Sequence, residues 1–318
     1  MVEITQRRVA TNGIELNIAE AGDGPLVIMC HGFPESWYSW RYQFGPMAEA
    51  GFHAVAPDMR GYGKSDKPRA VTAYNQVEVQ KDIVGLVSAL GYDKAIVLGH
   101  DWGAPTAWGC ARDYPDVFTA VGCLSVPYMP RVPLPPMQLM REAFKDQFFY
   151  QLYFYDEGVA EAEFEADIRL AMRKFLHFAS AEMDWSQMPV KGPGDDLFTG
   201  LPFPDILPDW LSQDDLDFYV GEFERSGMRG PLNYYRNHDL TWELTKDSPT
   251  TIEQPAMFAA GDKDTVLVFM AEALKAMPTY VKDLRINELI PGAGHWTQQE
   301  APEATTALIM KFLNEVRG

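Results

Sequence analysis

The sequence has few cysteines and no long apolar run. Its three cysteines, Cys30, Cys110 and Cys123, are too few and odd in number for a disulfide-built scaffold. We therefore expect buried, reduced thiols in a cytoplasmic protein. No apolar stretch approaches the length needed to span a membrane. The first six residues carry mixed charges with no apolar run after them, which argues against a signal peptide.

Positive charge is also scarce. The chain has 27 Lys and Arg against 45 Asp and Glu, a net charge of -18, and no basic run interrupts this balance. These features predict no nucleic-acid partner and no association with anionic membranes. No cluster of His and Cys has the spacing of metal ligands, so we expect neither a metal nor an organic cofactor. The sequence leaves a monomer and a homodimer equally open.

With 318 residues, 47% of them hydrophobic, the chain is long enough for a large core and an inserted subdomain. Asn12-Gly13 is a strong two-residue turn signal and predicts a hairpin over residues 3–21. Apolar strand-like runs then alternate with helical stripes. The predicted strands lie at 25–30, 53–57, from Ala95 to the turn near Asp101, and at 118–124, with helices after Ser36 and over 74–90. This alternation predicts a parallel sheet covered on both faces.

The pattern changes near Pro127, where five prolines mark a linker. From there to about Leu244 no buried strand is predicted, and aromatic-rich helical stretches at 144–155 and 164–178 precede a Pro- and Gly-rich loop at 188–208. Strands return at 256–260 and 284–290, and a helix covers 302–316. We predict an α/β fold in which residues 1–128 and 246–318 form a mostly parallel sheet flanked by helices, and 129–245 form an inserted helical lid.

One stretch indicates the chemistry. Gly99-His100-Asp101-Trp102-Gly103 reads as the end of a strand, a sharp turn and the start of a helix. This is the Gly-x-nucleophile-x-Gly elbow, with Asp101 where an esterase has serine. A carboxylate at this point can displace a leaving group from an sp3 carbon and form an alkyl ester, which water must then hydrolyse. The alternative reading of Asp101, a helix-capping residue, weakens once a histidine and an acid follow in the right order.

Ester hydrolysis requires a base, an acid that orients it, and N–H donors for the oxyanion. His295 lies in a Gly-rich turn after the last predicted strand and is the expected base. Asp264 is the preferred acid, with Asp262 as the minority choice, because Asp264 lies deeper in the loop after the preceding strand. His31 and His100 neighbour the motif turns and are read as supports. The expected oxyanion donors are the main-chain N–H groups of Phe33 and Trp102.

Together these motifs resemble the soluble epoxide hydrolases of the α/β-hydrolase superfamily over essentially the whole chain. The motifs are His31-Gly32-Phe33-Pro34-Glu35-Ser36, Asp58-x-Arg60-Gly61-x-Gly63, Gly99-His100-Asp101-Trp102-Gly103-Ala104 and Gly292-x-Gly294-His295-Trp296. Residues 148–154 and 229–236 are similar to the lid segments that carry the two tyrosines of that family, which implies roles for Tyr150 and Tyr235. Without the resemblance, both tyrosines would be read as lid packing.

The resemblance implies conversion of an epoxide to a vicinal diol. Opening the ring produces an alkoxide, which is far more basic than a phenolate of pKa about 10, so two phenols aimed at the ring oxygen can polarise it and supply a proton. We expect an apolar pocket for a small epoxide. Its candidate lining residues are Phe33, Trp102, Phe148, Gln151, Phe154 and Trp296.

Two other functions stay open. Haloalkane dehalogenases share the aspartate elbow and the tryptophan after it, but commonly carry Asn as a halide donor where Phe33 stands here. Haloacid enzymes such as the fluoroacetate dehalogenases place Arg at the position of Trp102. The second alternative is a non-catalytic ligand-binding protein of the same fold, against which the complete set of catalytic residues argues. The sequence does not predict which epoxide is used, nor regio- or enantioselectivity.

Overall fold

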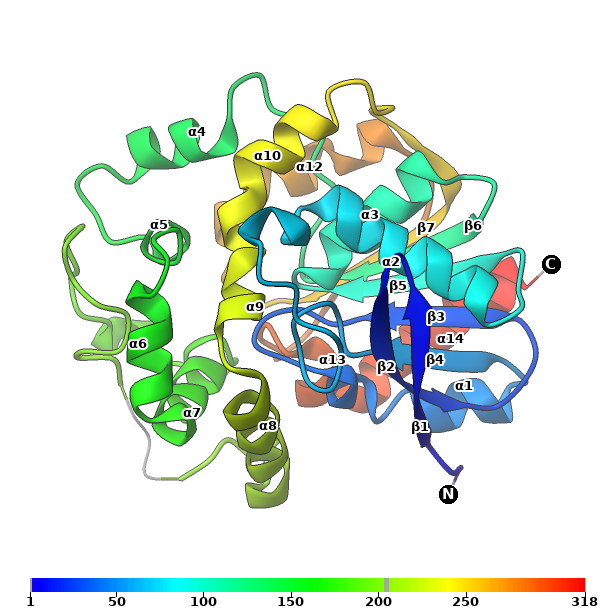
Figure 1. Cartoon of the computed structure of the whole chain (residues 1–318), viewed down its shortest axis with the longest axis horizontal. Coiled ribbons are helices and arrows are strands. Elements are labelled where there is room, and N and C mark those ends of the chain that lie inside the picture. Colours follow the sequence, from blue (N-terminus) through cyan, green and yellow to red (C-terminus); the bar gives the residue numbers. More distant parts are fainter. Residues whose placement is uncertain (1, 203–205, 318) are drawn as a thin grey trace.

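A computed structural model describes residues 2–202 and 206–317 of the chain. Its central element is an eight-stranded sheet in the order β1-β2-β4-β3-β5-β6-β7-β8 (Figure 1). The strands are β1 (Thr5–Thr11), β2 (Ile14–Ala21), β3 (Leu26–Cys30), β4 (His53–Pro57), β5 (Ala95–His100), β6 (Phe118–Leu124), β7 (Ile252–Gly261) and β8 (Val281–Ile290). β1, β2 and β4 pair in antiparallel fashion, and every pair from β4 through β8 is parallel. The mostly parallel sheet and the opening hairpin were both predicted.

The inner parallel strands β3 and β5 are buried on both faces because alternate side chains enter two different cores. In β3, Leu26, Ile28 and Cys30 belong to one apolar cluster, and Val27 and Met29 belong to the other. Such strands read as continuous apolar runs rather than as alternating ones. This is why the sequence pattern located them well.

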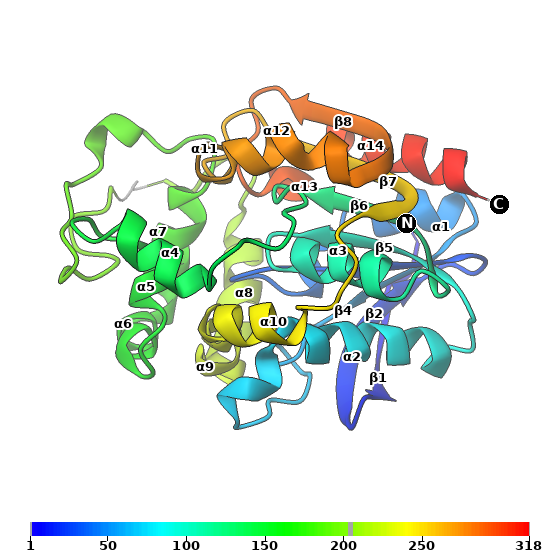
Figure 2. The ribbon, with the colours of Figure 1, turned by 90° about the horizontal axis from the view of Figure 1, so that it is seen from above.

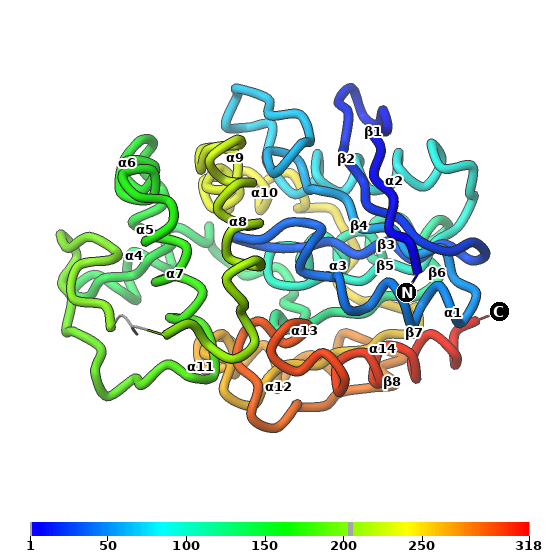
Figure 3. The backbone as a smooth tube through the Cα atoms, turned by 90° about the horizontal axis from the view of Figure 1, so that it is seen from below, coloured from blue at the N-terminus to red at the C-terminus, as the bar shows by residue number. Residues whose placement is uncertain are grey.

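Helices cover both faces of the sheet. On one face α3 packs against β5 and β6, with α2 beside it (Figures 2 and 3). On the other face α1 packs against β4 and touches α14, which packs against β7 and β8. The helices and short turns of the sheet domain are η1 (Trp37–Trp40), α1 (Phe44–Glu49), η2 (Val71–Tyr74), α2 (Gln76–Ala89), α3 (Gly103–Asp113), α11 (Val266–Phe269), α12 (Ala271–Tyr280), α13 (Thr297–Glu300) and α14 (Pro302–Val316). None of the helices in the described residues is long and apolar enough to cross a membrane.

A helical lid is inserted between β6 and β7, and its helices gather at one side of the sheet (Figures 1 and 2). They are α4 (Pro136–Ala143), α5 (Tyr150–Tyr153), α6 (Val159–Ala166), α7 (Ile168–Phe178), η3 (Trp185–Gln187), α8 (Gln213–Ser226), α9 (Arg229–Asn233), η4 (Tyr235–Asn237) and α10 (His238–Leu244). Tyr38 and Arg41 of the sheet domain both reach Asp215 of the lid, at 2.9 and 3.1 Å. The exact domain boundaries at 128 and 246 stay a prediction.

The structure differs from the prediction in the first part of the lid. Residues 144–155 were expected to be helical, but α4 ends at Ala143 and only the four residues of α5 are helical in that stretch. The ring of Phe144 stacks on that of Phe149 at 3.9 Å, which requires a turn between them. The predicted helix at 164–178 is broken at Asp167, whose side chain caps α7. The predicted loop at 188–208 contains no helix or strand in its described part, and residues 203–205 lie outside it.

Candidate active site

Asp101 lies on a sharp turn between β5 and α3, with a backbone φ of 48°. The turn is possible because its flanking glycines have no side chains. A Cβ on Gly99 would lie 2.1 Å from the carbonyl oxygen of Gly103, and one on Gly103 would lie 2.0 Å from that of Cys30. The backbone therefore presents Asp101 above the end of β5, as the elbow motif predicts.

The two carboxylate oxygens of Asp101 have different partners. Oδ1 accepts a 2.7 Å hydrogen bond from the main-chain N–H of Phe33, and Oδ2 lies 3.4 Å from Nε2 of His295. The turn after β3 thus places one of the two expected oxyanion donors on the expected nucleophile. Trp102 follows Asp101 directly, and the role of its N–H stays a prediction. The arrangement leaves Oδ2 as the oxygen that faces the base.

His295 follows β8, is 5% exposed, and meets Asp264 rather than Asp262. Its Nδ1 lies 3.2 Å from both carboxylate oxygens of Asp264, a residue of the loop after β7. Asp262 is exposed and accepts a 2.8 Å hydrogen bond from the N–H of Gly292. Of the two predicted candidates for the orienting acid, the structure brings only Asp264 to the histidine.

Sequence reasoning missed one buried residue between these two side chains. Ser125 follows β6, and its Oγ donates a 2.5 Å hydrogen bond to Asp264 Oδ2 and lies 2.9 Å from His295 Nδ1. No motif marks it. Its position offers a signal, since it ends the strand between those that carry Asp101 and Asp264. Four neighbouring parallel strands, β5 to β8, thus each deliver one residue of the cluster just beyond their carboxyl ends.

His100 and Glu35 support the cluster from beneath, as expected for His100. Its Nε2 lies 2.8 Å from the main-chain oxygen of His295, and its Nδ1 lies 2.7 Å from Glu35 Oε2. Glu35 also accepts a 3.0 Å hydrogen bond from the N–H of Gly32, next to the Phe33 donor. His31 accepts a 3.0 Å hydrogen bond from the N–H of Met59 and is a support as well. The loops on both sides of Asp101 are therefore held by buried side chains.

Tyr150 begins α5, and Tyr235 begins η4, so two distant parts of the lid place the phenols together. Their ring centroids are 6.0 Å apart at 78°. Gln151 Nε2 donates a 3.0 Å hydrogen bond to the hydroxyl oxygen of Tyr150, which leaves the hydroxyl proton of Tyr150 free for another acceptor. Tyr235 packs edge-on against Trp102 at 5.0 Å. These are the two tyrosines for which the resemblance to the epoxide hydrolases implies roles.

Burial and neighbouring charges shift the pKa values of Asp101, Asp264 and His295. Burial would raise the pKa of Asp101, but the hydrogen bond and charge of His295 outweigh burial and hold that pKa below its usual value. The pKa of Asp264 is lowered in the same way, since His295 and Ser125 overcome the effect of burial. Burial would lower the pKa of His295, yet the charge of Asp264 and the hydrogen bond to Asp101 raise it well above its usual value. The resting cluster is therefore two carboxylates that share one imidazolium.

The phenols are held in their neutral form. Burial, the largest influence, and the negative charge of Asp101 raise the pKa of Tyr235 well above its usual value. Burial also raises the pKa of Tyr150, and the hydrogen bond from Gln151 opposes this rise. The ring of Tyr235 lies 5.4 Å from that of Phe33 and 5.0 Å from that of Trp102, the residues on either side of the Asp101 carboxylate, and the ring of Tyr150 lies beside that of Tyr235. Both phenols therefore lie in the same region as the anion.

The predicted pocket residues divide into two groups. Trp102, Phe148 and Gln151 are partly exposed, so their roles as lining residues stay predictions. Phe154 and Trp296 are completely enclosed, at 0% exposure, and their roles as lining residues stay predictions as well. The Trp296 indole donates a 2.7 Å hydrogen bond to the main-chain oxygen of Leu176. Phe33, 1% exposed, packs among the lid aromatics.

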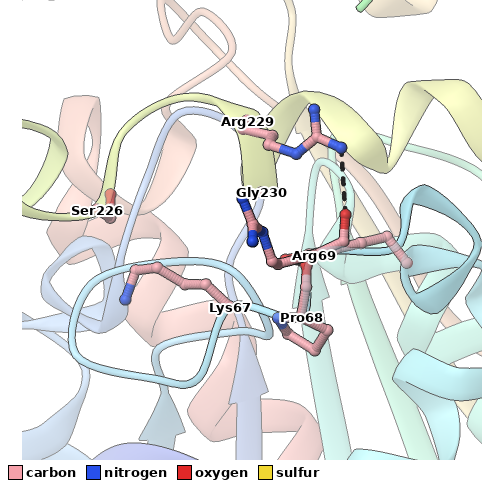
Figure 4. Close-up of a pocket in the computed structure, with 7 residues that line it drawn as sticks. Lys67, Pro68, Arg69, Ser226, Arg229 and Gly230 are labelled. Carbon is pink, nitrogen blue, oxygen red and sulfur yellow. Dashed lines mark hydrogen bonds between the residues drawn. The ribbon is translucent and has the colours of Figure 1, made fainter.

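No three His, Cys, Asp or Glu side chains in residues 2–202 and 206–317 are grouped so that they could hold a metal ion. A cavity of about 430 Å³ lies where the lid meets the loop before α2 and is lined by Lys67, Arg69 and Arg229 among others (Figure 4). Arg229 donates a 3.1 Å hydrogen bond there to the main-chain oxygen of Arg69. None of the residues around Asp101 lines this cavity.

Comparison with known proteins agrees with the geometry. A family model described as the alpha/beta hydrolase fold matches residues 25–302. Epoxide hydrolase A of Mycobacterium tuberculosis is 44% identical over 316 residues, which cover 97% of each chain. Epoxide hydrolase 3 of Siraitia grosvenorii is 38% identical over 99% of this chain and 100% of its own. A solved epoxide hydrolase from an endophytic Streptomyces superposes with a TM-score of 0.94 at 42% identity, covering 99% of this chain and 96% of that one.

Proposed function

Because this chain belongs to the epoxide hydrolases of the α/β-hydrolase fold, we propose that it forms its vicinal diol through an alkyl ester on Asp101. The observation that carries this proposal is the division of the Asp101 carboxylate between Phe33 and His295. One oxygen is held by an N–H donor, and the other lies 3.4 Å from His295 Nε2. This arrangement suits displacement at carbon followed by attack of water on the ester.

In the first half-reaction Asp101 Oδ2 attacks one epoxide carbon, and the bond from that carbon to the ring oxygen breaks. Tyr150 and Tyr235 donate hydrogen bonds to the ring oxygen, and one phenol transfers its proton as the alkoxide develops. The pKa of Asp101, lowered by His295 against burial, keeps the nucleophile ionised, and the raised pKa of each buried phenol keeps the donors protonated. The products are an ester on Asp101 and one phenolate.

In the second half-reaction His295 removes a proton from water, and the hydroxide attacks Cγ of Asp101. The carbonyl oxygen Oδ1 becomes an oxyanion that the N–H of Phe33 stabilises, with the N–H of Trp102 as the second expected donor. Breakdown of this intermediate cleaves the bond from Cγ to Oδ2, and the diol leaves with Oδ2. His295 returns its proton to Oδ2 as the diol leaves, and the proton of the regenerated Asp101 carboxyl then passes to His295, which restores the carboxylate.

Ester formation also prepares the base. While Asp101 is ionised, its hydrogen bond and charge contribute to the raised pKa of His295. Alkylation removes that negative charge, so the pKa of His295 falls, its proton passes to the phenolate formed in the first half-reaction, and the neutral imidazole becomes available. Asp264 continues to hold Nδ1, so Nε2 faces the ester. The base is thus released at the stage at which it is needed.

Other properties belong to the same proposal. The substrate is a small apolar epoxide, which meets an aromatic lid, and Trp102, Phe148 and Gln151 are its expected contacts. Residues 129–245 form the lid domain.

Cys30, Cys110 and Cys123 are buried and free, with each thiol pKa raised by burial, which suits a reducing compartment such as the cytoplasm. The protein functions as a monomer or homodimer.

Two measurements test the function. Purified protein is offered styrene oxide or a terminal bromoalkane, and diol and bromide are followed; diol without bromide is expected, and bromide alone would contradict the proposal. In the second, a single turnover in ¹⁸O-water is expected to leave the label in the carboxylate of Asp101 and an unlabelled diol. Label that appears only in the first diol would mean that water attacks the epoxide directly and that no ester forms.

A further inference from the structure

Ser125 is buried at the centre of the acid–base cluster although its backbone conformation is unfavourable for serine. Its φ is 71°, in the left-handed region, and it is 0% exposed. Its main-chain N–H donates a 2.9 Å hydrogen bond to the carbonyl oxygen of Ala259 in β7, which extends the pairing of β6 with β7 by one residue. The sheet therefore fixes Ser125 between the histidine and its acid.

The hydroxyl makes closer contacts than the direct pair does. Ser125 Oγ is 2.5 Å from Asp264 and 2.9 Å from His295, whereas the direct contacts of His295 Nδ1 to Asp264 are 3.2 Å. The Asp264 carboxylate is ionised and can only accept, so the serine O–H donates to it. The remaining lone pairs of Oγ then face the N–H at Nδ1 of His295. The histidine is thus tied to its acid both directly and through serine.

With the hydrogen bond from Ser125, both carboxylate oxygens of Asp264 have a donor. Its Oδ1 accepts a 2.9 Å hydrogen bond from the main-chain N–H of Val266, and its Oδ2 accepts from Ser125. Both oxygens are therefore fixed, and the plane of the carboxylate cannot rotate away from the imidazole. The proton stays on Nδ1, and Nε2 is directed to Asp101.

We propose that Ser125 is a positioning residue for the hydrolytic half-reaction, in which its hydroxyl holds Asp264 and His295 so that Nε2 faces the water that attacks the ester. No proton is transferred to serine: when His295 takes a proton from water at Nε2, the hydroxyl keeps its bond to Asp264 and accepts a stronger bond from Nδ1–H. Attack of Asp101 on the epoxide needs no base, so the first half-reaction does not depend on this hydroxyl. The inference rests on the proposed function.

Two substitutions separate the hydroxyl from the backbone. Ser125→Ala removes Oγ but keeps the unfavourable φ, and Ser125→Gly removes Oγ while favouring that φ. If serine served only the turn, the glycine variant would hydrolyse the ester as fast as wild type. If the hydroxyl positions the base, both variants lose the same step. Ser39→Ala is the matched control, because Ser39 is also 0% exposed and its hydroxyl lies 2.9 Å from that of Tyr219.

The experiment follows one turnover of styrene oxide by rapid quench, with mass spectrometry of the ester on Asp101. In both Ser125 variants we expect alkylation within about threefold of wild type, hydrolysis slowed about 10- to 100-fold, and ester that accumulates. Ser39→Ala is expected to leave both steps unchanged.

Each of the other possible results contradicts either the role of the Ser125 hydroxyl or the proposed function. Unchanged hydrolysis in Ser125→Ala, or wild-type hydrolysis in Ser125→Gly, overturns the role of the hydroxyl. An equal loss of alkylation and hydrolysis in both variants also overturns it, because the effect is then on the whole site. Wild-type enzyme that forms diol without any ester overturns the proposed function itself, and the two failures are therefore distinguishable.

Discussion

The indole Nε1 of Trp296 donates a 2.7 Å hydrogen bond to the main-chain oxygen of Leu176, at the end of α7 in the lid. Trp296 follows His295 in the chain, and the N–H of His295 itself donates to the carbonyl oxygen of Ala179, at 2.9 Å. The loop that carries the base is therefore joined to the lid by two hydrogen bonds. The position of His295 is therefore coupled to that of the end of α7.

Trp296→Phe tests this attachment. The variant keeps an aromatic ring but leaves the buried oxygen of Leu176 without its donor, so we expect a loss of about 1–3 kcal/mol in the free energy of unfolding. Urea unfolding of the two proteins measures the difference. Trp185→Phe in the lid is the control, since Trp185 is 41% exposed. Equal stability of Trp296→Phe and wild type would show that this hydrogen bond contributes nothing.

The phenols are tested by Tyr150→Phe and Tyr235→Phe. Each loss of an O–H removes one donor to the ring oxygen, and we expect alkylation to slow about 10- to 100-fold in the single variants and about 10³-fold or more in the double variant. Rapid-quench measurement of ester formation gives these rates. Tyr153→Phe is the matched control, because Tyr153 lies in the same helix and donates to Glu163 instead. Rapid alkylation by the double variant would exclude the phenols from ring opening.

His295→Gln is expected to form the ester and retain it. Alkylation needs no base, whereas hydrolysis does, so we expect hydrolysis to slow by about 10²- to 10⁴-fold. Intact-protein mass spectrometry after mixing with excess epoxide detects the adduct. His53→Gln, at a half-buried histidine bonded to Glu20 and Tyr92, serves as the control. Steady diol production without an adduct would place the base elsewhere.

The two half-reactions are expected to differ in pH dependence. Alkylation needs Asp101 ionised and the phenols protonated, and its rate is expected to be flat between about pH 5 and 9, because the pKa of Asp101 is lowered and those of the buried phenols are raised. Hydrolysis needs neutral His295 and is expected to rise with pH through the pKa of His295 in the ester. Single-turnover rates at a series of pH values measure both. An alkylation rate that follows the same titration as hydrolysis would contradict the assignment.

Arg236, next to Tyr235, connects the two lid segments that carry the phenols. Its guanidinium pairs with Glu161 at 2.7 Å and donates a 3.0 Å hydrogen bond to the main-chain oxygen of Phe154, just beyond α5. Arg236→Met leaves Glu161 buried without its cation, and we expect a cost of about 3–5 kcal/mol in the free energy of unfolding together with slower alkylation.

The control for this substitution is Arg169→Met, which breaks the exposed pair of Arg169 with Asp217 in the same lid. We expect it to cost less than about 1 kcal/mol, since exposed ion pairs contribute little. Denaturant unfolding and rapid quench give both readouts. Equal effects of the two substitutions would show that the buried pair has no special role.

Much of the site was predictable because it depends on short local motifs and on strand order. The elbow at Asp101 is a property of consecutive residues, and His295 and Asp264 follow from the order in which parallel strands deliver their carboxyl ends. Ser125 could not be predicted in this way. Its contacts form across the ends of three strands, and a serine after an apolar run carries no signal of its own.

The lid was less predictable than the sheet. Buried parallel strands have long apolar runs and fixed neighbours, whereas the lid packs aromatic side chains without a regular period. Phe144 and Phe149 stack face to face and interrupt the expected helix. The placement of Phe154 and Trp296 depends on their enclosure by residues far away in sequence, which no local pattern records.

The lid leaves the sheet after β6 and returns at β7, two strands that pair directly, Cys123 with Phe258. The length of the inserted segment therefore does not affect the spacing of the sheet. A different lid could therefore be joined at these two junctions, but it would have to supply both phenols and the main-chain acceptors of Trp296 and His295. The sheet domain carries Asp101, Asp264 and His295, whereas opening of the ring would depend on the inserted segment as well.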